Sequence, residues 1–369
     1  MRRTRDVGVE LARVLACLIV IGVHVKLPSL VGSSYDYGRI LISCILSDGV
    51  ALFWFISGFF LFDSTSFQKV LKRMLTRVLA PAFAVGVVSF LLQGVLHYGI
   101  LGAIVRPASD YFAIIWGLLC WENPFELAPH LWYVFAYALV ILGFPILKLF
   151  SDYLCEQPRR ERTFVLVAIA LLGINDLTRN ATLEFSHHGL AAAAPAALEM
   201  LCGRIVYRHR AQLTEKLPLM VLAPLVFLTT NAVRAAIQLY DYQTDPSIIH
   251  ISRWYSVSAI ICVLCVFVFC FSWGKKKRGP ATERLVVQLG SYTFPVYLIH
   301  YLVLGFFDTL GVSRLLQAIL PIAGHGALSF VFAIVYTALM IALVGLVSLG
   351  ICMALRRMRS LTAQDRHGS

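Results

Sequence analysis

Residues 11–27 read LARVLACLIVIGVHVKL, an apolar run that carries two ionisable side chains, Arg13 and His24. The two lie eleven positions apart, about three turns of an α-helix, so both project from one helix face, roughly 16 Å apart along the axis. If this helix crosses a bilayer, Arg13 lies near one surface and His24 lies buried in the other half. Ionisable residues inside a membrane span are costly, and by default they mark a functional site that faces the bundle interior.

The composition of the chain is that of a membrane protein. Of its 369 residues, 59% are hydrophobic and 14% are charged, whereas about a quarter of the residues in a soluble domain are charged. Several apolar runs of about 20 residues are long enough to cross a hydrocarbon core. We therefore expect an all-α polytopic protein of the cell membrane (inner or plasma membrane), with one transmembrane domain over residues 1–355 and a short basic cytoplasmic tail over residues 356–369.

Apolar runs place about ten transmembrane helices in this domain. The apolar segment 108–121 is short, and we leave open whether it is an interfacial or a re-entrant piece. The ten expected spans lie near residues 10–28, 39–62, 78–98, 129–150, 163–179, 189–206, 217–238, 254–273, 289–307 and 324–355.

The distribution of basic residues supports this count. With the N-terminus in the cytoplasm, 24 of the 32 Lys and Arg residues fall on the cytoplasmic side and seven on the other, and Arg13 is the remaining one. This asymmetry follows the positive-inside rule and predicts cytoplasmic positions for both termini. The net charge of +12 is then a topology signal, so we expect the lipid bilayer and no nucleic acid as a partner.

The chemistry of Arg13 and His24 leaves two interpretations open at this point. A neutral imidazole can accept a proton from a hydroxyl near neutral pH, and a guanidinium suits phosphate groups. Alternatively, Arg13 extends to the membrane surface and His24 is satisfied by a backbone carbonyl of a neighbouring helix.

Five stretches, in the right order, resemble the signature motifs of the membrane-bound acyltransferase family 3. Each is weak alone, but together they span nearly the whole chain. They are Arg13 and His24 with ten residues between them, Phe53-Trp54-Phe55-Ile56-Ser57-Gly58-Phe59-Phe60-Leu61, Lys72-Arg73 to Arg77 followed by Pro81, His130-Leu131-Trp132-Tyr133, and Tyr297-Leu298-Ile299-His300.

This resemblance implies an integral-membrane O-acyltransferase that moves an acyl group, usually acetyl, from cytoplasmic acyl-CoA to a hydroxyl of an extracytoplasmic glycan or lipid-linked sugar. His24 is then catalytic, and it either deprotonates the acceptor hydroxyl or carries the acyl group transiently. Arg13 binds the donor. Acetyl-CoA enters as a substrate, and we expect no permanently bound cofactor, no metal site and no fused esterase-like domain.

Basic residues at the start of the third span are further candidates for donor binding. Arg73 and Arg77 lie one helical turn apart and can face one phosphate cluster. The two arginines of the family motif are usually three positions apart, whereas these are four apart with Lys72 adjacent. This departure leaves open whether Lys72 or Arg73 pairs with Arg77. The alternative is that all three are ordinary cytoplasmic anchoring charges.

Asp48 is the candidate partner of His24, and with it forms the catalytic pair that the sequence predicts. Both residues lie in the outer half of their spans, and a carboxylate beside an imidazole would fix its tautomer and stabilise the imidazolium formed during transfer. The alternative pairs Asp48 with Lys26 or Arg39 near the surface.

Five more residues are assigned to acceptor binding or to the acyl tunnel. The family match favours acceptor binding by His130 and a tunnel-shaping role for Tyr297 and His300, although hydrogen bonding between helices explains the last two equally well. Trp132 belongs either to this site or to the interfacial aromatic belt. Ser57 lies in a small-residue pair, for which close helix packing is the simpler interpretation.

A second class of protein also fits part of the sequence. Glu199 is an intramembrane carboxylate without an assigned role, for which Arg204, Arg208 and Arg13 are candidate partners. Intramembrane His, Arg and Glu residues are typical of proton-coupled transporters, here an exporter of a saccharide. The pairing of Arg13 with His24 and the His-Leu-Trp motif favour the enzyme.

Overall fold

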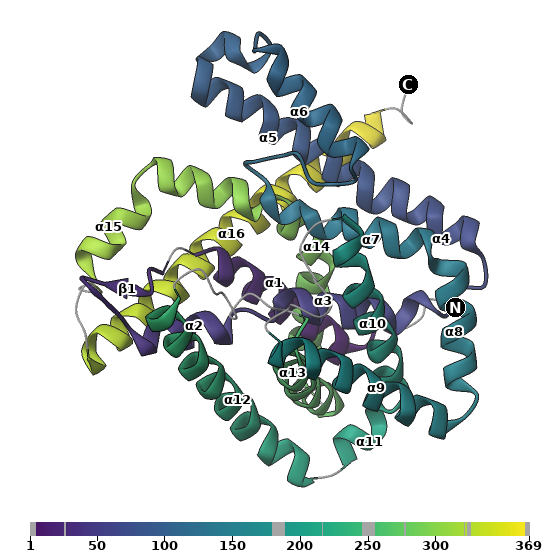
Figure 1. Cartoon of the computed structure of the whole chain (residues 1–369). Coiled ribbons are helices and arrows are strands. Elements are labelled where there is room, and N and C mark those ends of the chain that lie inside the picture. Colours follow the sequence, from purple (N-terminus) through teal and green to yellow (C-terminus); the bar gives the residue numbers. More distant parts are fainter. Residues whose placement is uncertain are drawn as a thin grey trace.

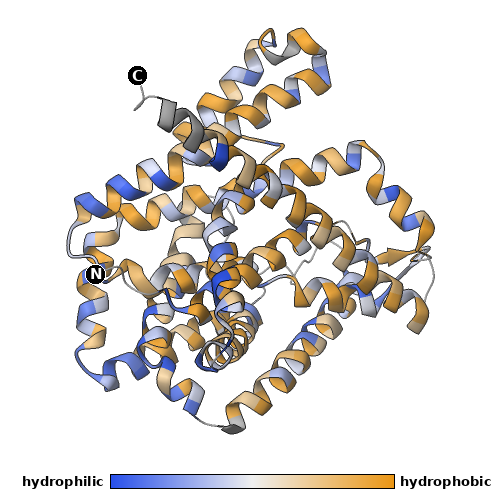
Figure 2. Cartoon of the chain, turned by 180° about the vertical axis from the view of Figure 1, so that it is seen from behind, coloured by the Kyte–Doolittle hydropathy of each residue, from blue (hydrophilic) through white to orange (hydrophobic). Residues whose placement is uncertain are grey.

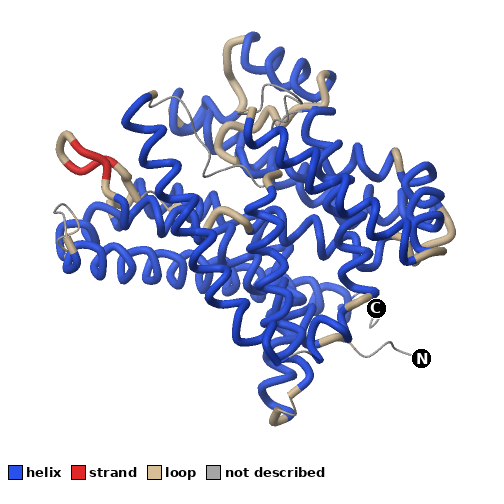
Figure 3. Tube along the Cα trace, turned by 60° about the horizontal axis from the view of Figure 1, so that its bottom comes forward, coloured by secondary structure: helices blue, strands red, loops and turns tan. Residues whose placement is uncertain are grey.

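The computed structural model describes residues 5–25, 27–178, 189–215, 217–245, 255–276, 278–320, 322 and 326–365. These residues are almost entirely helical apart from one antiparallel hairpin, β1–β2, in which Leu30 pairs with Tyr35 (Figure 3). The expected all-α class is confirmed. In chain order the elements are α1 (Val7–His24), β1 (Leu30–Val31), β2 (Ser34–Tyr35), α2 (Tyr37–Ile45), α3 (Gly49–Leu61), α4 (Phe67–Met74), η1 (Leu75–Leu79), α5 (Ala80–Tyr98), η2 (Ile100–Ala103), α6 (Ala108–Leu119), η3 (Pro129–Leu131), α7 (Trp132–Leu142), α8 (Phe144–Cys155), α9 (Pro158–Leu177), α10 (Gly189–Arg208), α11 (Arg210–Glu215), α12 (Leu217–Thr244), α13 (Val257–Lys275), α14 (Pro280–Thr309), α15 (Val312–Ile319) and α16 (Ala327–Asp365).

Seven helices of the described chain are long and apolar enough to cross a membrane, and the bent pair α7–α8 would make an eighth. The seven are α1, α2–α3, α4–α5, α12, α13, α14 and α16. The two other expected spans, 163–179 and 189–206, are largely helical as α9 and α10. The count of ten and the cytoplasmic termini stay predictions. The basic segment expected as a tail continues α16 as far as Asp365.

Three of the expected spans are interrupted. α2 ends at Ile45 and α3 begins at Gly49, so residues 46–48 form a break inside the second span. The chain bends by 71° between α7 and α8, where Pro145 lacks the N–H that a continuous helix would need. The third span contains a π-helical turn, η1, just before Pro81, which likewise removes a backbone donor.

Helix α1 occupies the centre of the bundle and packs against α3, α13, α14 and α16 (Figure 1). Two glycines allow close approach to it. A Cβ at Gly49 of α3 would lie 2.9 Å from the carbonyl oxygen of Ala16, and one at Gly8 of α1 would lie 2.8 Å from that of Cys270 in α13. These backbone contacts fix the orientation of α1 and therefore the positions of Arg13 and His24.

Helices α3 and α10 form the second close pair of the bundle. A Cβ at Gly58 of α3 would lie 2.8 Å from the Cα atom of Met200, and one at Gly203 of α10 would lie 2.7 Å from the Cα atom of Phe55. Each helix therefore presents a glycine to the backbone of the other. The close packing expected around Ser57 is present in the structure.

The bundle has two distinct ends. The N-terminus, α4 and α8 lie at one end, and β1 and α15 lie at the other (Figure 1). Hydrophilic residues gather at the N-terminal end, while apolar residues dominate the long helices (Figure 2). The segment 108–121 contains the helix α6, which forms with α5 a hairpin that projects from the bundle (Figure 1).

Candidate active site

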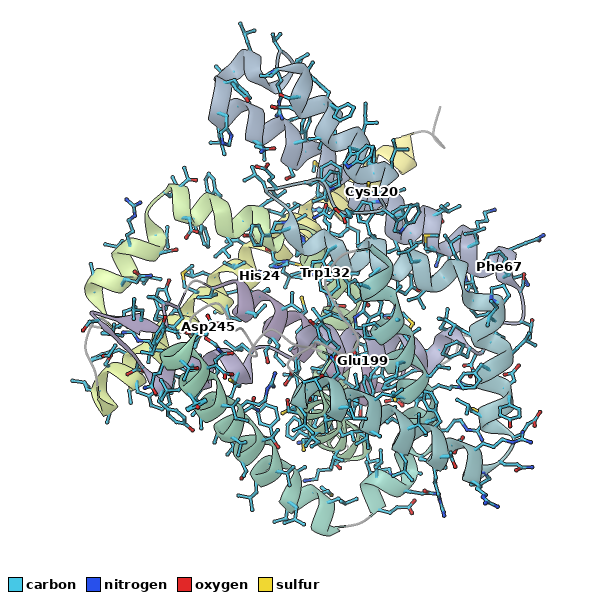
Figure 4. The ribbon with its side chains drawn as sticks, viewed as in Figure 1. His24, Phe67, Cys120, Trp132, Glu199 and Asp245 are labelled. Atoms are coloured by element: carbon cyan, nitrogen blue, oxygen red, sulfur yellow. The ribbon has the colours of Figure 1, made fainter. Side chains whose placement is uncertain are left out.

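Three histidines from distant parts of the sequence meet inside the bundle. His24 is the last residue of α1 (Figure 4), His130 lies in the short turn η3, and His300 lies in α14. The ring centroid of His24 is 5.4 Å from that of His300 and 6.3 Å from that of His130, and the latter two are 4.7 Å apart. Tyr301 borders the group, with its ring 5.1 Å from that of His24. We call His24, His130 and His300 the histidine cluster.

Backbone carbonyls fix the proton positions on two of these rings. Nε2 of His130 lies 3.2 Å from the carbonyl oxygen of Leu298, and Nδ1 of His300 lies 2.6 Å from that of Tyr297. A carbonyl oxygen only accepts hydrogen bonds, so each of these nitrogens donates. In a neutral ring the other nitrogen then carries a lone pair. Those nitrogens, Nδ1 of His130 and Nε2 of His300, are buried and have no hydrogen-bond partner among the described residues.

A cavity of about 580 Å³ lies beside the histidine cluster. Tyr297 lines this cavity and links it to the cluster, because its hydroxyl donates to the carbonyl oxygen of His130. Four cations also line it, which makes the cavity strongly basic in spite of its apolar walls. They are Arg5, Arg13, Arg73 and Arg77.

A second cavity of about 820 Å³ adjoins the basic end of this one. Arg5, Arg13 and Arg73 border both cavities, so the two adjoin at this end. The second cavity adds Lys69 and Arg210 to the cationic lining, and the carboxylates of Asp6, Glu10 and Asp63 also line it. Guanidinium groups gathered in this way suit a polyanionic ligand, because each can form charge-assisted hydrogen bonds to phosphate.

A buried carboxylate that the sequence interpretation missed orients Arg13. Oε1 of Glu10 lies 3.0 Å from Nη1 of Arg13 and 3.8 Å from Nη1 of Arg5, and Glu10 is only 4% exposed. Gly290 of α14 makes room for this carboxylate, since a Cβ there would collide with the Glu10 side chain. The signal was present in the sequence, because Glu10 lies one turn before Arg13 in the same helix.

The structure distinguishes between the two basic neighbours at the start of the third span. Arg73 and Arg77 both line the cavity. All three side chains are exposed, but Lys72 does not belong to the lining of either cavity. The cation that shares the cavity with Arg77 is therefore Arg73.

Comparison with known families agrees with this arrangement. The family model of acyltransferase 3, described as an acyltransferase domain, matches residues 6–353. The chain belongs to the acyltransferase 3 family. The resemblance inferred from the five motifs is therefore confirmed, and this acyltransferase lies within the membrane-spanning part of the chain. No curated protein and no solved structure matches it.

Asp48 of the acyltransferase does not contact His24, and that prediction was wrong. Its Oδ2 atom lies 2.8 Å from Nη1 of Arg234 in α12, and its neighbour Ser47 accepts a second bond from the same guanidinium at 2.8 Å. Asp48 sits at the break between α2 and α3, which turns its side chain toward α12. Arg39, an alternative partner, instead donates to the carbonyl oxygen of Pro28. The other alternative partner, Lys26, lies outside the described residues.

Glu199 of the acyltransferase is fully buried on α10 (Figure 4), and neither of its oxygens has a hydrogen-bond partner in the described part of the chain. Its candidate partners are engaged elsewhere: Arg204 with Asp63 at 2.7 Å, Arg208 with Glu161 at 3.0 Å, and Arg13 with Glu10. Glu199 therefore forms none of the three ion pairs considered from the sequence.

Two predicted residues, Ser57 and Trp132, remain to be placed relative to the cavity and the histidine cluster. Ser57 lines the cavity, where its hydroxyl lies 3.4 Å from that of Tyr133. Trp132 is partly buried at the start of α7 (Figure 4), two positions after His130 in the chain. Tyr301, which the sequence interpretation did not select, directly follows His300 in the chain. Among the described residues, no group of three His, Cys, Asp or Glu side chains is arranged to hold a metal ion.

Proposed function

We propose that this protein is an O-acyltransferase that moves an acyl group, acetyl in the simplest case, from cytoplasmic acyl-CoA to a hydroxyl of an extracytoplasmic glycan or lipid-linked sugar. The observation that carries the proposal is the cavity with four arginines along its wall and Tyr297 at the boundary with the histidine cluster. A CoA ester has the matching form, with phosphates at one end and a thioester on a long arm at the other.

The donor is held by charge. The phosphates of the donor bind Arg73 and Arg77 together with Arg13, whose orientation is fixed by Glu10. The arm and the thioester then extend along the apolar wall towards Tyr297. Holding both reactants in one protein removes most of the entropic cost of bringing them together.

The acceptor enters from the side of the histidine cluster. Its hydroxyl donates its proton to His24, and the hydroxyl oxygen attacks the thioester carbon. This attack forms the new C–O bond, and the C–S bond then breaks. The departing thiolate takes the proton from the His24 imidazolium. The products are the acyl ester and free CoA. The free nitrogens of His130 and His300 accept hydrogen bonds from hydroxyls of the acceptor.

Mass spectrometry of surface glycans and glycolipids, from cells with and without the gene, tests this proposal. We expect an acetyl ester on one glycan class to disappear in the deletion strain and to return with the wild-type gene. Unmodified glycans in normal amount identify the lost step as acyl transfer. An unchanged ester pattern with a reduced amount of exported saccharide would contradict the proposal and favour a transporter.

A further inference from the structure

Three aromatic rings lie at one end of the cavity of about 580 Å³, which we call the donor cavity because we propose that it binds the acyl donor. Phe53 of α3, Tyr133 of α7 and Tyr297 of α14 all line the cavity. The ring centroid of Phe53 is 6.2 Å from that of Tyr133 and 6.0 Å from that of Tyr297, and the two tyrosines are 5.8 Å apart. Aromatic rings at these separations pack against one another, so they narrow the path from the cavity to the histidine cluster. We call these three residues the aromatic collar.

The aromatic collar lies at the end of the cavity away from the phosphate-binding residues. Phe60 borders both the cavity of about 580 Å³ and the second cavity of about 820 Å³, whereas Phe53 borders only the first. The two are seven positions apart on α3, about 10 Å along its axis. The collar is therefore about two helical turns farther from the basic end than Phe60 is.

The histidine cluster lies on the far side of the aromatic collar. The ring of Tyr297 is 5.2 Å from that of His130 and 5.8 Å from that of His300. None of the three histidines is among the described residues that line the cavity. An acyl chain that enters from the basic end therefore reaches the collar before it reaches the cluster.

Two hydroxyl groups at the collar can hold the carbonyl group of a thioester. The hydroxyls of Ser57 and Tyr133 lie 3.4 Å apart, and both residues line the cavity. Either hydroxyl can donate to the carbonyl oxygen of a thioester in these otherwise apolar surroundings. A carbonyl held there leaves only the carbons beyond it to fit against the three rings.

We propose that the aromatic collar limits the length of the transferred acyl chain and so restricts this protein to short acyl groups such as acetyl. The inference rests on the proposed function, because it takes the donor to be an acyl-CoA. Each carbon beyond the acetyl methyl group has to displace a ring that is packed against two others. Apolar pockets commonly discriminate between ligands that differ by one methylene by about tenfold or more.

Donor binding to the purified full-length protein tests the inference without knowledge of the acceptor. Dissociation constants are measured for free CoA, acetyl-CoA, butyryl-CoA and hexanoyl-CoA. For the wild type we expect hexanoyl-CoA to bind at least about tenfold more weakly than acetyl-CoA. Phe53→Ala opens the collar and should reduce this ratio to within about twofold. Phe53→Leu, which keeps more of the packing, should reduce it partly and serves if the alanine variant does not fold.

Two further variants separate the collar from the rest of the cavity. Phe60→Ala removes the same side chain from the same helix at the basic end, so it should leave the chain-length ratio unchanged even if all donors bind less well. Tyr133→Phe keeps the ring and removes the hydroxyl, so it should keep the ratio and weaken acetyl-CoA relative to free CoA.

The possible failures are distinguishable. Equal affinity of the wild type for acetyl-CoA and hexanoyl-CoA would overturn the inference, as would a ratio that Phe60→Ala relaxes as much as Phe53→Ala or Phe53→Leu does. If the folded wild type binds neither free CoA nor any acyl-CoA, the donor assignment in the proposed function fails, and the inference fails with it.

Discussion

At the scale of single residues, the members of the histidine cluster differ in how their rings are held. His130 and His300 each donate a hydrogen bond from one ring nitrogen to a backbone carbonyl oxygen. This bond holds each ring in place. No described residue forms such a bond with the imidazole of His24, which is the last residue of α1 and lies beside Tyr301. A group that must first take up and then release a proton benefits from this freedom, so we assign the proton transfer to His24.

His24→Ala is expected to lower the turnover of acetyl-CoA by about 10²- to 10⁴-fold, the usual contribution of a general base. Membrane insertion and thermal stability should change little, because His24 is partly exposed. His97→Ala is the control, since His97 is an exposed histidine on α5. Steady-state kinetics and thermal unfolding of the purified variants measure both effects. A variant that keeps wild-type turnover would remove His24 from the mechanism.

Arg73→Gln and Arg77→Gln are each expected to raise the KM for the acyl donor about tenfold and to change the KM for the acceptor much less. A hydrogen bond to a charged group contributes about 1.5–3 kcal/mol, and about 1.4 kcal/mol corresponds to a factor of ten. Lys72→Gln removes a charge next to Arg73 without touching the cavity, so it should change the donor KM less than about twofold. If all three substitutions changed the donor KM equally, the three basic residues would be ordinary anchoring charges and not donor-binding groups.

At the scale of secondary-structure elements, the sequence predicted helices well and their interruptions poorly. Apolar runs gave the positions of the spans because burial in lipid requires them. The break at residues 46–48 was not predicted, since residues 39–62 are apolar enough for one helix. That break decides the partner of Asp48. Depth in the membrane was similar for Asp48 and His24, but depth does not reveal which neighbouring helix a side chain faces.

Asp48→Asn is expected to destabilise the fold by about 3–5 kcal/mol, because it breaks the buried ion pair between Asp48 and the guanidinium of Arg234. Turnover per folded molecule should fall far less than in His24→Ala. The control is Asp152→Asn, which breaks the ion pair with Lys148 at the surface and should cost no more than about 1 kcal/mol. Thermal and denaturant unfolding in detergent compare the two. Unchanged stability with lost turnover would return Asp48 to a catalytic role.

At the scale of the whole molecule, α1 connects the two sides of the proposed reaction. Its 18 residues extend about 27 Å, close to the thickness of the hydrocarbon core. Arg13 borders the basic cavity, and His24 is the last residue of the helix, eleven positions farther on. The spacing of Arg13 and His24 predicted that they lie far apart on one helix, whereas their assignment to donor and acceptor came from the resemblance to the family and stays a prediction. The sequence did not predict the aromatic collar, because the three rings come from spans whose relative rotation depends on packing.

The number of membrane crossings is testable at Thr178, the exposed residue at the end of α9. If α9 and α10 both cross the membrane, ten spans result, and Thr178 faces the side opposite to the N-terminus. The test uses a background in which Cys120 and Cys155 are replaced by serine, because the other seven cysteines are buried. Thr178→Cys should then react with a membrane-impermeant maleimide on intact cells.

Two positions calibrate this experiment. Ser33→Cys, in the exposed turn between β1 and β2, should react on intact cells, whereas Lys69→Cys, at the N-terminal end of the bundle, should react only after permeabilisation. If Thr178→Cys behaves like Lys69→Cys, α9 and α10 enter and leave by the same face, and eight spans remain. The ends of the other helices keep their sides in either case, because removing two consecutive crossings preserves the alternation. The donor cavity and the histidine cluster would therefore still face opposite sides of the membrane.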